Sequence, residues 1–156
     1  MSSPSEVAEE HKEELFAFVG ENAGYYEMAW FSSNRPKFNW VAALLALPWL
    51  VYRKMYGVAG VFFANLVIVG GVLSIFLSEI VISVLAGAIC GFLGNRWYFK
   101  HVHRKVALVQ SKESTKEKRL EILARRGGVN LGGAIAVAFI GLVLVILSDF
   151  YASPAY

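Results

Sequence analysis

The sequence predicts an all-α membrane protein with three transmembrane helices, a short re-entrant or interfacial helix and cytoplasmic amphipathic helices. Apolar residues make up 56% of the 156 residues and charged residues only 17%, whereas a soluble domain has about 25% charged residues. Three apolar segments come close to the ~20 residues that a helix needs to span a bilayer. All 15 Lys and Arg residues then fall on one side, which the positive-inside rule identifies as cytoplasmic.

Residues 1–37 are expected to form an acidic, helical cytoplasmic region. The start of the chain has no basic stretch followed by an apolar one, so no cleavable secretory signal is expected. Residues 3–6 (SPSE) have the form of a capping box with Pro at the first helical position, and Gly20 should end that helix. Asn22 can cap a second short helix, which residues 32–36 break. Anionic lipid would repel this acidic region, so its aromatic side chains are expected to pack on protein.

The segment 38–55 begins with an apolar stretch, residues 38–52, that is too short to cross a bilayer comfortably and is interrupted by Pro48. Trp40, Trp49 and Tyr52 suit the headgroup level, which indicates a re-entrant or interfacial helix. The alternative is that this segment forms a fourth transmembrane helix that crosses a locally thinned bilayer. It would move the basic residues that precede it to the outer side, so the three-span topology is favoured.

Residues 56–98 are predicted to form a transmembrane helical hairpin. As one helix they would run about 64 Å, roughly twice the ~30 Å hydrocarbon core, so we expect a break at Ser78-Glu79. The third transmembrane helix is predicted over residues 129–148, and residues 149–156 form an outer tail. The N-terminus is therefore expected in the cytoplasm and the C-terminus outside.

The intervening segment, residues 99–128, is a basic cytoplasmic arm. Its cations could bind anionic lipid headgroups or a partner, could serve only as topology determinants, or could lie against the acidic N-terminal region. Nucleic-acid binding is not expected, because the aromatic residues that begin at Trp97 are better explained as a membrane-interface belt. The candidate contacts to headgroups or a partner are Arg53, Lys54, Arg96, Lys100, Arg104, Lys105, Arg125 and Arg126.

Small residues recur at spacings of four in the apolar segments, which lets helix backbones approach closely in lipid. The candidate helix-packing residues are Ser83, Gly87, Gly91, Gly128, Gly132 and Asn65. Packing within the chain, homodimerisation and docking to another membrane protein all remain open. Asn65, near the middle of its span, is expected to hydrogen-bond across a helix interface.

The sequence offers no catalytic constellation, so no enzyme activity and no cofactor are expected. His101 and His103 would point about 200° apart on a helix, which argues against a shared metal. Cys90 lies in mid-membrane, where a packing role is expected. No ionisable side chain other than Cys90 lies deep in a span, which argues against a coupled transporter.

Several short sequence motifs resemble those of a known protein family. They are Phe18-Val19-Gly20, Asn22-Ala23, Tyr25-Tyr26, Phe38-Asn39-Trp40, Pro48-Trp49, Tyr52-Arg53-Lys54-Met55-Tyr56, Gly94-Asn95-Arg96 and Gly127-Gly128. From about Phe18 to Asn130 the chain resembles the bacterial domain of unknown function 2628. The resemblance implies a small bacterial multi-pass membrane protein, and it implies no activity or catalytic residues. We expect the protein in the bacterial inner membrane.

The sequence therefore favours a non-enzymatic accessory subunit or assembly and interaction protein, with a membrane protein or a second copy of itself as partner. A small oligomeric channel or facilitator is the alternative. In that case Asn65, Ser74 and Ser83 would line the path.

Overall fold

A computed structural model describes residues 4–33 and 38–152, and every element within these ranges is helical. The long helices are α1 (Pro4–Val19), α5 (Tyr56–Leu73), α6 (Glu79–Gln110), α7 (Lys116–Arg126) and α8 (Leu131–Ala152), and the shorter elements are η1 (Gly20–Asn22), α2 (Ala23–Phe31), α3 (Trp40–Leu45) and α4 (Leu47–Tyr52). The predicted all-helical class is confirmed.

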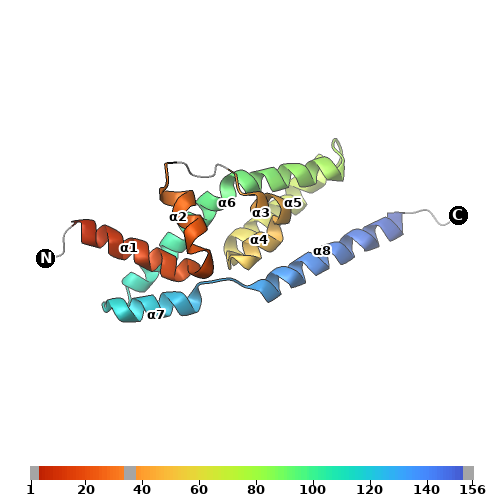
Figure 1. The fold of residues 1–156 in the computed structure, drawn as a ribbon. Coiled ribbons are helices and arrows are strands. Elements are labelled where there is room, and N and C mark those ends of the chain that lie inside the picture. Colours follow the sequence, from red (N-terminus) through yellow and green to blue (C-terminus); the bar gives the residue numbers. More distant parts are fainter. Residues whose placement is uncertain (1–3, 34–37, 153–156) are drawn as a thin grey trace.

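Helix α6 is the central element of the fold (Figure 1). Its 32 residues correspond to about 48 Å at ~1.5 Å per residue, well beyond the ~30 Å hydrocarbon core. The apolar N-terminal part contacts α3 and α5, and the C-terminal part contacts α1, α2 and α7. Val102, Val106 and Val109 bury one face of that C-terminal part. We call α1, α2, α7 and residues 98–110 of α6 the head.

Glycines shape the joints of the head. Helix α1 begins at Pro4 and ends at Val19, directly before Gly20, which takes a φ of +73° that L side chains rarely adopt. The link from α7 to α8 passes against this end, and Gly128 N–H donates to Phe18 O at 2.8 Å. A Cβ on Gly127 would collide with the Phe18 carbonyl. The α1 terminus and the start of the third apolar helix are therefore fixed to each other.

The short helices α3 and α4 pack against α6 and α8, and the break between them lies at Ala46, which has a φ of 38°. The expected interruption at Pro48 is thus displaced by two residues. Pro48 sits in the first turn of α4, where its missing N–H costs no helical hydrogen bond. Asn39 caps α3 by accepting a hydrogen bond from Ala42 N–H at 2.9 Å.

Within residues 4–33 and 38–152, three helices are long and apolar enough to cross a membrane, namely α5, α6 and the apolar part of Lys116–Ser148, which is α8. Helix α5 ends at Leu73, short of the predicted residue 77, and α8 begins at Leu131 and continues past the predicted end at residue 148. The α5–α6 turn and the end of α8 lie towards the same end of the molecule, away from the head (Figure 1).

Two aromatic residues predicted to lie in the membrane-interface belt are instead buried in the protein. Tyr98 is 0% exposed and Trp49 only 2% exposed, because they form the core between α2, α4 and α6. Trp97 lies beside Phe62 of α5, with ring centroids 6.4 Å apart. The predicted cap at Ser3 and most of the predicted break after α2, residues 34–36, lie outside the described residues.

Candidate functional site

The aromatic core contains a buried arginine. Arg53, directly after α4, is 5% exposed, and its guanidinium carbon lies 4.8 Å from the ring centre of Tyr26, 5.1 Å from that of Tyr52 and 5.3 Å from that of Tyr98. Its Nε and Nη1 have no hydrogen-bond partner, and no ion pair among the described residues includes it. Arg53, a candidate contact to headgroups or a partner, is therefore buried among aromatic rings instead of lying on the open surface.

Beside Arg53 lies a cavity of about 720 Å³ between α2, α3, α4 and α8. Its wall is mainly apolar and includes Trp40, Leu45, Leu131 and Ile135. Among the described residues that line it, Arg53 is the one charged side chain. The cavity is therefore an apolar space with a single cation in its wall.

Asn95 of α6 joins three helices next to this cavity. Its Oδ1 accepts a hydrogen bond from Asn39 Nδ2 at 2.8 Å, and its Nδ2 donates to the Tyr25 hydroxyl at 3.2 Å. Trp30 Nε1 donates to the Asn95 carbonyl at 3.2 Å. The aromatic residues of α2 thus pack on protein, as predicted for this acidic region.

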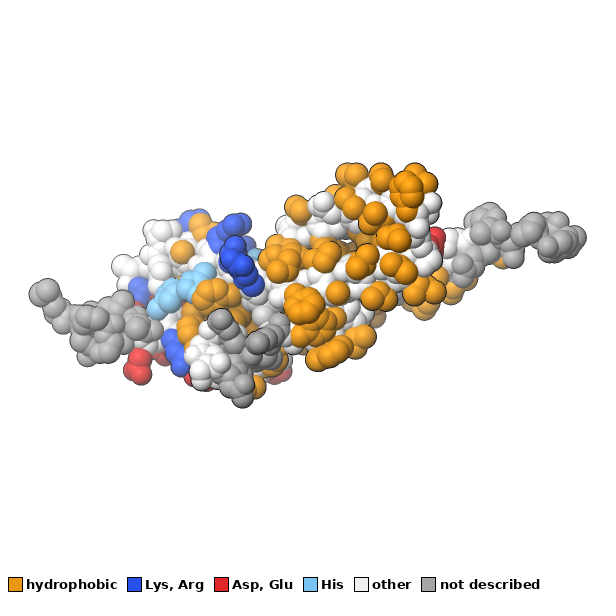
Figure 2. Space-filling view, turned by 90° about the horizontal axis from the view of Figure 1, so that it is seen from above, with side chains coloured by type: hydrophobic (Ala, Val, Ile, Leu, Met, Phe, Trp, Pro, Cys, Tyr) orange, Lys and Arg blue, Asp and Glu red, His pale blue; other side chains and the backbone are white. Residues whose placement is uncertain are grey.

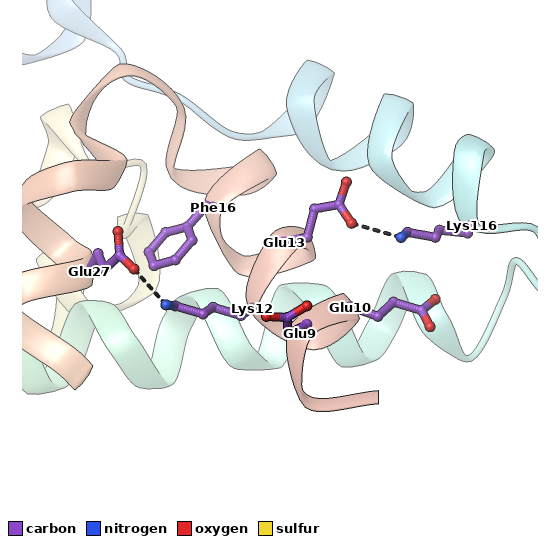
Figure 3. A pocket seen from close by; sticks show the side chains of 7 residues that line it. All are labelled: Glu9, Glu10, Lys12, Glu13, Phe16, Glu27 and Lys116. Carbon is purple, nitrogen blue, oxygen red and sulfur yellow. Dashed lines mark hydrogen bonds and ion pairs between the residues drawn. The ribbon is translucent and has the colours of Figure 1, made fainter. Parts of the chain in front are cut away.

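The acidic N-terminal helix α1 lies against the basic arm. This is the third of the alternatives given for the basic arm, in which its cations contact the acidic N-terminal region. Arg119 of α7 donates from Nε to Glu14 at 2.6 Å and from Nη2 to Glu10 at 2.5 Å. The Glu14 side chain is 0% exposed, and its second oxygen accepts from Gln110 Nε2 at 2.6 Å. On the surface nearby, Lys116 pairs with Glu13, as Figure 3 shows. An ionic contact therefore holds α1 to α7.

A second pocket, also drawn in Figure 3, is lined by charged side chains of α1, α2 and α7. Lys12 reaches across it to Glu27 of α2, at 2.5 Å. Both side chains are more than one third exposed, and exposed pairs of this kind contribute little, about 0–1 kcal/mol. Since these charges pair with one another, we interpret this pocket as a solvent-exposed space between helices and not as a ligand site.

Histidines occupy the interface between α1 and α6. His11 Nε2 lies 3.2 Å from His103 Nδ1, and Gln110 Nε2 lies 3.5 Å from His11 Nδ1. His101 stacks on Tyr98 with an interplanar angle of 15°. No group of three or more His, Cys, Asp or Glu side chains that could hold a metal occurs in the part of the chain that the structure describes.

Acidification is expected to destabilise the head. Burial, with help from Lys105 and Arg104, lowers the pKa of His101 to about 4, and burial together with His11 lowers the pKa of His103. The unfolded chain therefore binds more protons as the pH falls from about 6.5 towards 4, and stability is lost over that window, by about 1–2 kcal/mol at pH 5. Thermal unfolding at pH 7 and pH 5, followed by Trp fluorescence in detergent, measures this loss.

The control for this pH dependence is His101→Phe, which keeps an aromatic ring against Tyr98 and removes the titrating group. We expect a smaller difference in melting temperature between pH 7 and pH 5 for this variant. An unchanged difference would assign the acid sensitivity to other groups.

A groove of about 880 Å³ separates α5 from α6. Asn65 lines it and donates to Val61 O of its own helix at 2.8 Å, in place of the predicted bond across a helix interface. The side chain of an Asn in a helix can reach the backbone carbonyl four residues earlier, so this bond needs no second helix. Arg104 and Lys105 lie at the head end of the groove. Figure 2 shows apolar side chains over this part of the molecule and basic and His side chains towards the head.

The other predicted surface cations are placed as follows. Lys54 donates to the carbonyls of Arg126 and Gly127, so it stabilises the C-terminal end of α7, where a cation is favourable. The exposed members of the set are Arg96, Lys100, Arg104, Lys105, Arg125 and Arg126.

The predicted packing residues divide into two groups. A Cβ on Gly87 would lie 2.5 Å from Ala43 O, and one on Gly91 would collide with the Phe38 ring, so both glycines admit α3 against α6. Gly132 has nothing within 4 Å of its Cβ position, and Gly128 serves in the α7–α8 link. Ser83 is exposed. Gly87 and Gly91 of α6 therefore serve packing within this chain, whereas Ser83 does not contact α3 closely enough to be buried.

Sequence reasoning missed the pairing of Glu14 with Arg119, because several acids and bases alternate along both helices and no spacing rule selects one pair. It also missed Asn39, although an Asn immediately before an apolar helical stretch is a recognisable N-cap signal.

Comparison with known proteins gives one match. A family model described as Protein of unknown function (DUF2628) matches residues 5–104, which include the buried Arg53 and most of α6. Neither the search of curated proteins nor that of solved structures found a match. The match ends before Gly127-Gly128, so α7 and α8 lie beyond it. The chain belongs to the DUF2628 family.

Proposed function

We propose that this chain is a non-enzymatic, multi-pass protein of the bacterial inner membrane that works by association with another membrane protein or with a second copy of itself. Helices α5, α6 and α8 would span the bilayer, and the head would lie in the cytoplasm. Helices α3 and α4 would re-enter or lie at the cytoplasmic interface.

The placement of charge supports this orientation. Arg104, Lys105 and the cations of α7 lie at the head end, and the α5–α6 turn at the other end carries Glu79 and no basic residue (Figures 1 and 2). Lys and Arg are favoured on the cytoplasmic side of a membrane. The exposed cations would also attract anionic headgroups, at about 1 kcal/mol each.

Helix α8 is the single observation on which the associative role rests. It packs on α4 near its start and then runs apart from α5 and α6 (Figure 1). Ile135, Phe139 and Leu142 are each more than half exposed, and Gly132 and Gly141 have open space at their Cβ positions. Among the described residues α8 packs mainly on the short helix α4, and a span with small residues on an open face can pack closely on a helix of another protein.

The channel alternative gains no support from its proposed lining residues. Asn65 donates to Val61 O, and Ser74 Oγ donates to Gly71 O at 2.8 Å. Both polar groups therefore donate to backbone carbonyls of α5.

Photo-crosslinking in native membranes tests the association. A photoreactive residue at Ala136 on α8 is expected to give a discrete protein adduct, which Gly132→Leu weakens by blocking close approach. The matched control places the same group at Val84 of α6, which is 64% exposed and should give mainly lipid adducts. Lipid adducts alone at Ala136 would contradict the proposal.

Orientation is tested separately by cysteine accessibility in intact cells, with Cys90 replaced by Ala. An impermeant maleimide should label a cysteine at Ser78 and should leave one at Ser111 unlabelled. The reverse pattern would overturn the cytoplasmic placement of the head.

A further inference from the structure

Arg53 has no anionic partner among the described residues, and the neutral acceptors beside it are the Tyr26 and Tyr98 hydroxyls. A guanidinium stays protonated in proteins, and burying a charge is costly unless it is paired and hydrogen-bonded. Three tyrosine rings within 4.8–5.3 Å offset part of this cost through cation–π attraction. The Nε–H and Nη1–H groups nevertheless remain without hydrogen-bond acceptors.

The neighbouring phenols do not supply the missing negative charge. Burial raises the pKa of Tyr26 well above its usual range, although Arg53 acts in the opposite direction. The Tyr26 hydroxyl is therefore neutral at physiological pH. An external oxyanion is the partner that a guanidinium fits best, because carboxylate and phosphate oxygens match its planar array of donors.

The cavity that Arg53 lines indicates what carries this oxyanion. Its volume of about 720 Å³ is in the range of small-molecule sites, ~300–1,000 Å³. Its wall is built from apolar side chains of α3, α4 and α8, and it lies beside strongly exposed apolar residues, with Trp40 72% and Leu44 81% exposed. A ligand with one acidic headgroup and one or more acyl chains has matching chemistry.

The position in the fold also suits a lipid, and this step rests on the membrane placement proposed above. Asn130 N–H donates to Tyr52 O at 2.8 Å, so Arg53 lies level with the start of α8, where that span would leave the cytoplasmic headgroup region. The cavity then opens towards the acyl chains of the cytoplasmic leaflet.

We propose that the cavity between α2, α3, α4 and α8 binds one anionic phospholipid, whose phosphate is the counter-ion of Arg53 and whose acyl chain lies along the apolar wall. Among the described lining residues no carboxylate is present to pair with an ammonium group. The site therefore discriminates against a zwitterionic headgroup and favours a net negative one.

Native mass spectrometry of the full chain in detergent tests the site, with phosphatidylglycerol, phosphatidylethanolamine or inorganic phosphate added. One phosphatidylglycerol molecule is expected to remain bound, at least about tenfold more tightly than phosphatidylethanolamine. Arg53→Gln should weaken its binding at least about tenfold, which is the usual effect of losing a charged hydrogen-bond partner. Arg96→Gln is the matched control, because Arg96 is exposed on α6 and lines neither the cavity nor the α5–α6 groove; it removes only the general attraction of one exposed cation and should weaken binding no more than about fivefold.

A second variant keeps the test valid if Arg53→Gln disturbs the aromatic core. Ala138→Phe narrows the acyl-chain part of the cavity from the exposed side of α8 and should weaken phosphatidylglycerol binding without contacting Arg53. Equal binding of both lipids, unchanged binding in both variants, or binding of inorganic phosphate as tight as that of the lipid would overturn the proposal.

The two proposals fail in distinguishable ways. The lipid measurement uses purified protein and needs no partner, whereas the Ala136 crosslink needs no lipid at Arg53. Loss of the bound lipid in Arg53→Gln with the Ala136 adduct retained would support a lipid site separate from the association surface. A wild-type chain that crosslinks to a partner but retains no phosphatidylglycerol would refute the lipid site alone.

Discussion

Arg119→Met is expected to lower the free energy of unfolding of the head by about 3–5 kcal/mol, because it leaves a buried carboxylate without its cation. The Glu14 side chain is 0% exposed and the Arg119 side chain 12% exposed, so water cannot readily replace the lost partner. Gln110 would then be the remaining hydrogen-bond partner of Glu14 among the described residues. Denaturant unfolding in detergent, followed by the fluorescence of Trp30 and the other tryptophans, measures the change.

Two further variants distinguish the effect of the buried Glu14–Arg119 pair on stability from the effect of removing any positive charge. Lys116→Met removes an exposed pair with Glu13, whose side chains are 41% and 53% exposed, and should cost no more than about 1 kcal/mol. The double variant Glu14→Leu with Arg119→Met replaces both charges with apolar groups and should recover most of the loss. If Arg119→Met and Lys116→Met destabilise the head equally, the ionic contact does not hold α1 to α7 as described.

The helices were predictable from sequence because they depend on local patterns. Gly20 marks the end of α1, and the apolar lengths around residues 56–98 require a break near Ser78, where the structure places the turn before α6. The valines that repeat every three or four residues after Tyr98 lie on one buried face. Each of these features follows from periodicity, helix length or turn chemistry within a short window.

The candidate site was less predictable, because it depends on contacts between segments far apart in the chain. Arg53 follows an apolar stretch and precedes Lys54, which made an interfacial position the natural interpretation. It is buried because α2 and α6 supply Tyr26 and Tyr98 from positions distant in sequence. The glycine spacing of α6 indicated a packing face, yet the spacing alone could not show that α3 occupies it.

Gly87→Leu is expected to displace α3 from α6 at a cost of about 3 kcal/mol or more, at the upper end of overpacking effects. A Cβ on Gly87 would lie 2.5 Å from the Ala43 carbonyl oxygen, and a backbone atom cannot rotate out of the way. The lone cysteine reports the displacement, because Cys90 is 0% exposed and lies three residues away on the same side of α6 as Gly87. Its labelling rate with N-ethylmaleimide should rise at least about tenfold.

Gly132→Leu provides the opposite case within the same chain. Nothing lies within 4 Å of the Cβ position of Gly132, and leucine is a better helix former than glycine by roughly 0.5–1 kcal/mol. The labelling rate of Cys90 should therefore stay at its wild-type value in Gly132→Leu. Equal labelling rates in the Gly87 and Gly132 variants would mean that α3 is not seated on the glycine face of α6, and the cavity walls built from α3 and α4 would then lose their support.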